Sequence, residues 1–182
     1  MVTDDDTRII DPEFAFYGPM GFDLGAFLGN LLLNWYAQPG HATQPDDRVA
    51  YQDWVLGQIR IFWETFRSRF LALWAGHAKG DAFPAAFFPD PADAATVHAA
   101  RSQFLDSLFA DMLGFGACKM IRRIVGFAHV IDFDRIEDAA RRSRCEAGAL
   151  AMARLLLTHP EQFHTIDDVI DAVPRMGAHG SV

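Results

Sequence analysis

Apolar side chains recur at helical spacing through most of the sequence after residue 22. Residues 23–37 are apolar on nearly all sides, which is typical of a buried central helix. Residues 46–77 predict a long amphipathic helix, and Gly114 and Gly116 are expected to interrupt a later one. The apolar stripe of residues 46–77 comprises Trp54, Ile61, Phe62, Phe66, Phe70, Leu73 and Trp74. The expected helices span residues 23–37, 46–77, 90–113, 117–128, 134–157 and 166–173. The fold class is therefore predicted to be mainly α.

Two short motifs predict where the later helices begin. Asp134 with Glu137, and Thr165 with Asp168, have the spacing of a capping box, in which two side chains satisfy the free amides of the first helical turn. Residues 174–182 contain Pro, Gly and His, and this composition predicts a disordered tail after the last helix.

The first ten residues carry the only clear strand pattern. Residues 1–3 and 8–10 are short β-prone runs separated by the polar turn 4–7, so a β-hairpin is expected. Such a hairpin is unstable alone and should lie on another part of the molecule. With no linker or internal repeat in the sequence, residues 1–182 are predicted to form one domain.

Charge and segment lengths exclude several classes of function. Sixteen basic against 24 acidic residues give a net charge of −8, which disfavours nucleic acid and anionic membrane surfaces as partners. The longest apolar run, residues 24–37, is shorter than the roughly 20 residues that span a bilayer. The acidic N-terminus is unlike a signal peptide, so a cytoplasmic location is expected. Cys118 and Cys145 are isolated from each other and predict reduced thiols.

Two carboxylates lie close together at the end of the strand-like region. Asp11 and Glu13 flank Pro12, and in an extended segment residues i and i+2 point to the same face. Both can therefore converge on one hard cation, and Mg²⁺ is commonly held by one or two carboxylates together with substrate phosphates. From the spacing alone, a solvated acidic loop is the more common interpretation of such a pair.

Three blocks of the sequence resemble one enzyme family. Residues 10–23, IDPEFAFYGPMGFD, resemble the metal-binding segment of S-methyl-5-thioribose kinases. Residues 107–126, SLFADMLGFGACKMIRRIVG, resemble the paired-arginine segment of that family, and residues 136–140 also fit. The resemblance runs nearly end to end and becomes looser after residue 158. It implies the C-terminal helical lobe of a protein-kinase-like fold, preceded by a short hairpin.

The resemblance also implies roles for particular residues. Asp11 and Glu13 would ligate Mg²⁺ that bridges the phosphates of ATP. Arg122 and Arg123 would face the sugar pocket, where guanidinium donors suit hydroxyl and phosphoryl oxygens. The alternative is that these arginines interact only with the helix C-terminus or with solvent. Asp23 would support the backbone of the catalytic loop, which is compatible with its serving as an N-cap.

The implied reaction is ATP- and Mg²⁺-dependent phosphorylation of S-methyl-5-thioribose to its 1-phosphate, a step of methionine salvage. The family's nucleotide-binding lobe, phosphate-anchoring lysine and His-Gly-Asp catalytic loop have no counterpart here, since the only His-Gly pair is His179-Gly180. No catalytic base is therefore assigned, and the 182-residue chain alone is expected to be inactive. Exposed apolar surface is expected on residues 24–37 and on the hairpin, where the remaining lobe would dock.

Other functions stay open at this point. One is a kinase of the same fold acting on another small alcohol, such as an aminoglycoside, choline or homoserine. The long block 14–21 favours the thioribose reading, because aminoglycoside-type kinases usually have a simpler Asp-x-Asp there. Another is a non-catalytic helical binding or interface module, or the remnant of a gene. The expected partners are a small sugar and, as the family implies, a second copy of the chain or a missing N-terminal segment.

Overall fold

The computed structural model describes residues 6, 16–44, 46–76 and 87–178, and within them every regular element is helical. The elements are, in chain order, α1 (Gly21–His41), α2 (Val49–Gly76), η3 (Pro91–Asp93), α3 (Ala94–Val125), α4 (Ile131–Asp134), α5 (Ala139–Thr158), η4 (Pro160–Gln162) and α6 (Ile166–Ala178). The prediction of a mainly α fold is confirmed. The predicted β-hairpin falls on residues 1–10, nearly all of which lie outside the described residues.

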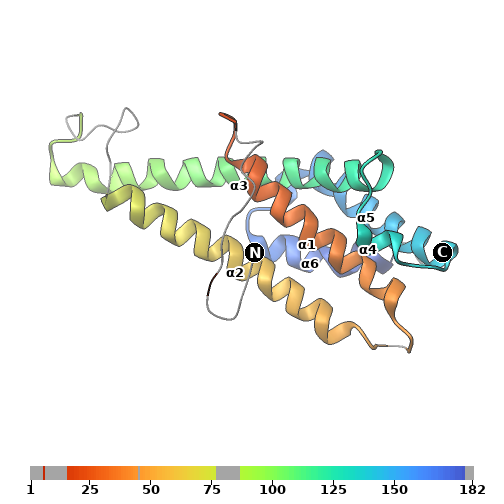
Figure 1. Cartoon of the computed structure of the whole chain (residues 1–182). Coiled ribbons are helices and arrows are strands. Elements are labelled where there is room, and N and C mark those ends of the chain that lie inside the picture. The colour runs from red at the N-terminus through yellow and green to blue at the C-terminus, as the bar shows by residue number, and fades with distance from the viewer. Residues whose placement is uncertain (1–5, 7–15, 45, 77–86, 179–182) are drawn as a thin grey trace.

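Helix α1 lies at the centre of the molecule and contacts α2, α3, α4 and α5 (Figure 1). Leu28, Leu32 and Leu33 are almost fully buried, as the apolar character of this helix predicts. The Tyr36 hydroxyl donates a 2.8 Å hydrogen bond to the Val173 carbonyl and so joins α1 to α6. Burial raises the pKa of Tyr36 far above its ordinary value, so this donor keeps its proton.

Glycines bring α1 and α3 unusually close together. Gly21, Gly25 and Gly29 recur every fourth residue and therefore lie on one face of α1. A Cβ at Gly25 would lie 2.6 Å from the Met112 carbonyl oxygen, and one at Gly29 would lie 2.8 Å from that of Gly116. These glycines form the α1 glycine stripe, and their missing side chains let the two backbones touch.

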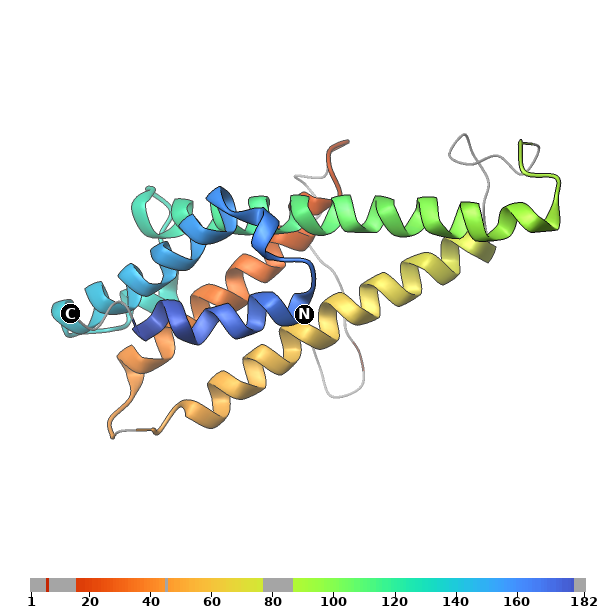
Figure 2. The same cartoon turned by 180° about the vertical axis from the view of Figure 1, so that it is seen from behind.

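Helices α2 and α3 extend past the rest of the molecule and meet at their far ends (Figures 1 and 2). This projection, residues 64–76 of α2 and 94–104 of α3, is the α2–α3 arm. The buried residues of α2 are Val55, Ile59 and Trp63, all of which precede the arm. The arm is held by aromatic contacts, including a stacked pair of Phe70 and Phe104 with centroids 6.2 Å apart.

The stripe expected along α2 is only partly correct. Phe62, Phe66 and Phe70 pack against the core, but Trp54, Ile61 and Leu73 are more than half exposed. Apolar residues in this helix cover more than one face. The buried ones, Val55, Ile59 and Trp63, are spaced by four residues. The expected stripe therefore combines residues that pack against the core with residues that are exposed.

The expected bounds of α3 and α5 are wrong in two respects. Helix α3 continues through Gly114 and Gly116, because Gly116 packs against α1 and stays helical. The helix expected to begin at Asp134 begins at Ala139 instead, and its cap is Asp138, whose carboxylate accepts from the Arg141 amide at 2.9 Å.

The prediction of a disordered tail is wrong for its first residues. Helix α6 continues through Pro174 to Ala178, so residues 174–178 are helical rather than frayed. Proline lacks only one amide donor, and the buried residues Ala172 and Val173 hold the preceding turn in place. Residues 179–182 lie outside the described residues.

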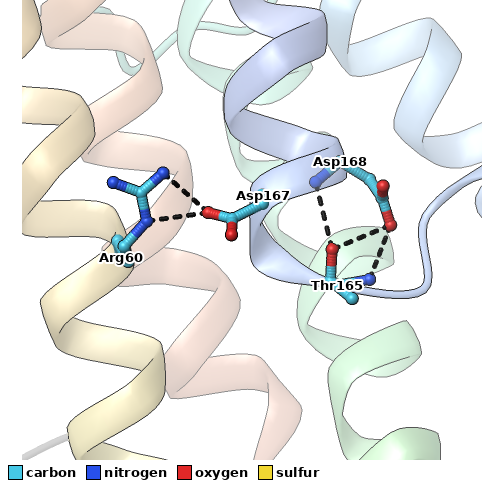
Figure 3. A network of polar contacts seen from close by, with 4 residues as sticks. All are labelled: Arg60, Thr165, Asp167 and Asp168. Atoms are coloured by element: carbon cyan, nitrogen blue, oxygen red, sulfur yellow. Dashed lines mark hydrogen bonds and ion pairs between the residues drawn. The ribbon is translucent and has the colours of Figure 1, made fainter.

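The start of α6 confirms the capping box at Thr165 and Asp168 (Figure 3). The Asp168 amide donates to Thr165 Oγ1 at 3.2 Å, and Asp168 Oδ2 accepts from the Thr165 amide at 2.8 Å. Beside this box, Arg60 of α2 forms a 2.7 Å ion pair with Asp167. In the ranges that the structure describes, no helix combines the length and apolar character that a membrane crossing requires.

Candidate functional site

The segment that leads into α1 lies against α3. Asp11 and Glu13 are outside the described residues, and the structure takes up the chain again at Phe16. The ring of Phe16 makes an edge contact with Phe22 at 5.4 Å, and Phe22 makes another with Phe115 of α3 at 5.7 Å. These aromatic contacts connect Phe16 through the first turn of α1 to α3.

Asp23 is not the N-cap of α1. The helix begins two residues earlier, at Gly21, with Met20 in the cap position and no side-chain hydrogen bond. Gly21 sits so close to Asp111 of α3 that a Cβ would lie 2.6 Å from the Asp111 Cβ, and this contact sets the helix start. Asp23 is instead an exposed residue of the first turn, where its negative charge interacts favourably with the positive end of the helix dipole.

The two adjacent arginines at the end of α3 differ in burial and in their hydrogen bonds. Arg123 is half-buried, and its Nη1 donates to the carbonyl oxygens of Ala128 and His129 at 3.1 and 3.4 Å. Its Nε is buried without a partner in the described part of the chain. Arg123 therefore holds the loop that follows α3. Arg122 is exposed and makes no hydrogen bond or ion pair with a described residue.

Lys119 joins the two arginines, and the sequence analysis missed it. Lys119, Arg122 and Arg123 follow the i, i+3, i+4 spacing that places residues on one side of a helix. Burial lowers the pKa of Lys119, and the charges of Arg123 and Arg122 lower it further. These three residues form the α3 cationic cluster. The sequence contains this i, i+3, i+4 spacing, and Lys119 stands out as one of only two lysines in the chain.

The described structure does not bring Asp23 and the paired arginines together. Gly21 contacts α3 at Asp111, and Arg122 follows 11 residues later on the same helix. At 1.5 Å per residue this is about 17 Å along the helix axis. The α3 cationic cluster thus stands apart from the start of α1.

Neither cysteine belongs to a metal site in the ranges described, where no cluster of three or more His, Cys, Asp or Glu side chains could hold a metal. Both cysteines are free thiols, as expected, with Cys118 exposed and Cys145 buried. Burial raises the pKa of the Cys145 thiol.

A cavity of about 570 Å³ lies at the other end of α1, between that helix, α5 and α6. None of the candidate residues Asp23, Arg122 and Arg123 lines this cavity.

Comparison with known proteins relates the chain to one group of enzymes. No family model matches it. Methylthioribose kinase 1 of Oryza sativa subsp. japonica is 50% identical over 171 residues, which cover 93% of this chain and 39% of that protein. Methylthioribose kinase of Escherichia coli O45:K1 is 41% identical over 172 residues, 94% of this chain and 41% of that protein. The one of Yersinia pestis strain Pestoides F is 41% identical over 176 residues. The chain thus spans about two fifths of the length of these relatives.

Proposed function

We propose that this chain, a homologue of methylthioribose kinases over about two fifths of their length, is the helical part of an ATP- and Mg²⁺-dependent kinase that phosphorylates S-methyl-5-thioribose at its anomeric hydroxyl. The observation that carries the proposal is the high identity to plant and bacterial relatives along nearly the whole chain. A central buried helix with a metal-ligand segment before it is compatible with the C-terminal lobe of a protein-kinase-like fold.

The donor chemistry of Asp11 and Glu13 fits the metal that such a kinase needs. Two carboxylates two residues apart offer the hard oxygen ligands that Mg²⁺ prefers. When bound, MgATP supplies the phosphoryl group, and its metal neutralises part of the phosphate charge. The role of the chain is then to present these two carboxylates to the metal.

The α3 cationic cluster supports a binding role for Arg122 rather than for both arginines. None of the five N–H donors of Arg122 has a partner among the described residues, whereas Nη1 of Arg123 donates a hydrogen bond to the loop after α3. In the proposed kinase, Arg122 binds the sugar or its phosphoryl group, and Arg123 is a positioning residue. Asp23 supports the catalytic loop from the first turn of α1.

An exchange of segments tests the proposal. The segment of the Escherichia coli kinase that aligns with this chain is replaced by residues 1–182, and ATP-dependent phosphorylation of S-methyl-5-thioribose is measured. The expected result is an active chimera whose activity depends on Mg²⁺ and is lost in Asp11→Ala and Glu13→Ala. Asp171→Ala, an exposed carboxylate on α6, is the matched control and should retain activity.

The outcomes of this exchange of segments distinguish the metal assignment and the proposed substrate from their alternatives. Activity retained in both carboxylate variants would contradict the metal assignment. A folded chimera without activity would favour a non-catalytic helical module, and turnover of choline or an aminoglycoside in place of the thioribose would favour another kinase of the same fold.

The two arginines are distinguished in the same chimera. Arg122→Gln should raise the KM for the sugar and leave thermal stability unchanged, because its side chain is exposed. Arg123→Gln should lower the melting temperature, because the Ala128 and His129 carbonyls lose their donor. The reverse pattern would assign the binding role to Arg123.

A further inference from the structure

The cavity at the C-terminal end of α1 has the dimensions of a small-molecule site. Its volume of about 570 Å³ falls within the range of roughly 300–1,000 Å³ that is usual for ligand pockets. Its walls come from four segments: the end of α1 with the following loop, the start of α2, the first turns of α5 and the end of α6. It is here named the α1–α5 cavity.

The charged groups that line this cavity have one sign. Arg141 and Arg144 are the charged side chains among its described lining residues, and no carboxylate is present there. Arg141 Nη1 donates to the Ala42 carbonyl at 2.8 Å, which fixes its guanidinium across the cavity from α5 to the end of α1. Arg144 makes no hydrogen bond or ion pair with a described residue, so its donors remain available. In a chain with a net charge of −8, this pair is a local site for an anion.

The neighbouring carboxylates are already engaged. Asp138 caps α5 by accepting from the Arg141 amide, and Glu146 lies 3.9 Å from Arg142. The Arg141 amide lowers the pKa of Asp138, and the charges of Arg141 and Arg144 help to lower it further, so this carboxylate offsets part of their positive charge. No acidic side chain among the described residues lines the cavity itself, where these two exposed arginines are the charged groups.

The opposite wall is aromatic. The rings of Trp35 and Tyr36 meet edge to face with centroids 4.9 Å apart, and both line the cavity. Gly148 and Gly177 pack against these rings and add no side chain that would fill the space. Such a wall suits a planar apolar group.

We propose that the α1–α5 cavity is a second ligand site, which binds a small organic anion with a planar apolar body and one carboxylate or phosphate group. Arg144 and Arg141 bind the anionic group, and the Trp35–Tyr36 wall contacts the planar body. Trp35 is the first residue of α1 that lines the cavity and follows Gly21 by 14 residues, so this site lies about 21 Å along the helix from the start of α1. The proposal does not depend on the kinase assignment.

A titration of the 182-residue chain tests the site with simple probes. Phenyl phosphate and benzoate carry a ring and an anionic group, phenol lacks the charge, and inorganic phosphate lacks the ring. Binding is followed by the NMR signal of the Trp35 indole N–H, which is assigned with Trp35→Phe. The signal of Trp63, buried between α2 and α3, reports on changes elsewhere.

Phenyl phosphate, benzoate or both should move the Trp35 signal without moving that of Trp63, and the tighter of the two identifies the preferred anionic group. Arg144→Gln should weaken that binding roughly tenfold, because a charge-assisted hydrogen bond is lost. Arg69→Gln, an exposed arginine on α2 outside the cavity, is the matched control. No response to either anion, equal binding by phenol or inorganic phosphate, or unchanged affinity in Arg144→Gln would overturn the proposal.

Discussion

At Gly25 the backbones of α1 and α3 leave no room for a methyl group. A Cβ there would lie 2.6 Å from the Met112 carbonyl oxygen and 2.7 Å from the Gly116 amide nitrogen, and neither backbone atom can rotate away. Gly25→Ala is therefore expected to lower the free energy of unfolding by about 1–3 kcal/mol, as overpacking of a core does. Urea denaturation followed by circular dichroism measures this change.

Gly57→Ala provides the matched comparison. Gly57 also lies inside a long helix, but a Cβ there would meet nothing within 4 Å. Alanine should raise the free energy of unfolding by about 0.5–1 kcal/mol, because it has the higher helix propensity. If both variants shifted stability in the same direction, the close approach of α1 and α3 at Gly25 would be contradicted.

The two thiols should differ in reactivity. Cys118 is exposed, whereas Cys145 is buried and its pKa is raised, so little of it is thiolate near neutral pH. Brief treatment of the native chain with iodoacetamide at pH 8 should add one group, located at Cys118 by peptide mass spectrometry. Cys118→Ser should show almost no rapid addition. Faster modification of Cys145 than of Cys118 would contradict the burial of α5 at this point.

At the scale of single elements, α6 depends on the ionised form of one carboxylate. Amide hydrogen bonds from Thr165 and His164, together with the Thr165 hydroxyl, lower the pKa of Asp168 below its ordinary 3.8. A carboxyl group whose pKa is lower in the folded state than in the unfolded state stabilises the fold at any pH above its unfolded-state pKa. That stabilisation is lost as the pH falls through the pKa of the folded state. The melting temperature should therefore fall on acidification below about pH 4 in part through Asp168.

Asp168→Asn isolates this contribution. The variant should have a lower melting temperature than the parent at pH 7, and the difference should shrink as the pH approaches 2. Asp171 is an exposed carboxylate on the same helix and makes no hydrogen bond to a described residue, so Asp171→Asn should leave both values unchanged. A difference that stayed constant with pH would show that the charge of Asp168 does not act at the capping box.

Helix periodicity predicted the elements well and their boundaries less well. The fold class and the Thr165–Asp168 box follow from local patterns, so the sequence alone was sufficient for them. The continuity of α3 through Gly116 depends on a neighbour 90 residues away, which no local pattern contains. Asp138 rather than Asp134 caps α5, because the short helix α4 intervenes.

The candidate site shows the same limit. Sequence similarity identified Arg122 and Arg123 as a pair, but only the positions of the Ala128 and His129 carbonyls separate their roles. The α1–α5 cavity is assembled from four segments distant in sequence, and nothing in any one of them indicates it. Asp11 and Glu13 remain a prediction of the sequence, since they lie outside the described residues.

At the scale of the molecule, residues 24–37 expose less apolar surface than expected, and nearly all of the expected hairpin lies outside the described residues. Within residues 24–37 the large apolar side chains are mostly buried, and Phe27 is the exposed exception. Phe16, Tyr17 and Phe22, before and at the start of α1, are among the exposed aromatic residues. Neighbouring exposed apolar side chains of this kind are suited to contact with another protein surface.

The 182-residue chain alone should not phosphorylate S-methyl-5-thioribose at a measurable rate. Its sequence contains no His-Gly-Asp catalytic loop, and phosphoryl transfer depends mainly on positioning and electrostatic stabilisation of both substrates. A coupled assay of ADP release, with the active chimera as the positive control, measures this. ATP-dependent formation of the sugar phosphate by the pure chain would contradict the prediction.

The α2–α3 arm should be the least stable part of the described helices. It contains none of the buried residues of α2 or α3, since those of α2 end at Trp63 and those of α3 begin at Leu105. Segments with few buried contacts open locally at a lower free energy than the core. Hydrogen exchange measured by mass spectrometry should therefore show faster exchange in residues 66–76 and 94–104 than in residues 28–38 and 105–120.

Two alanine substitutions compare the arm with the core in global unfolding. Leu32→Ala removes a fully buried side chain of α1 and should lower the free energy of global unfolding by about 2–5 kcal/mol. Phe70→Ala removes contacts of the arm and should change global unfolding by only about 1 kcal/mol. Its main effect should be still faster exchange in the arm, because the arm opens before the core unfolds. Equal losses in the two variants would mean that the arm and the core unfold as one unit.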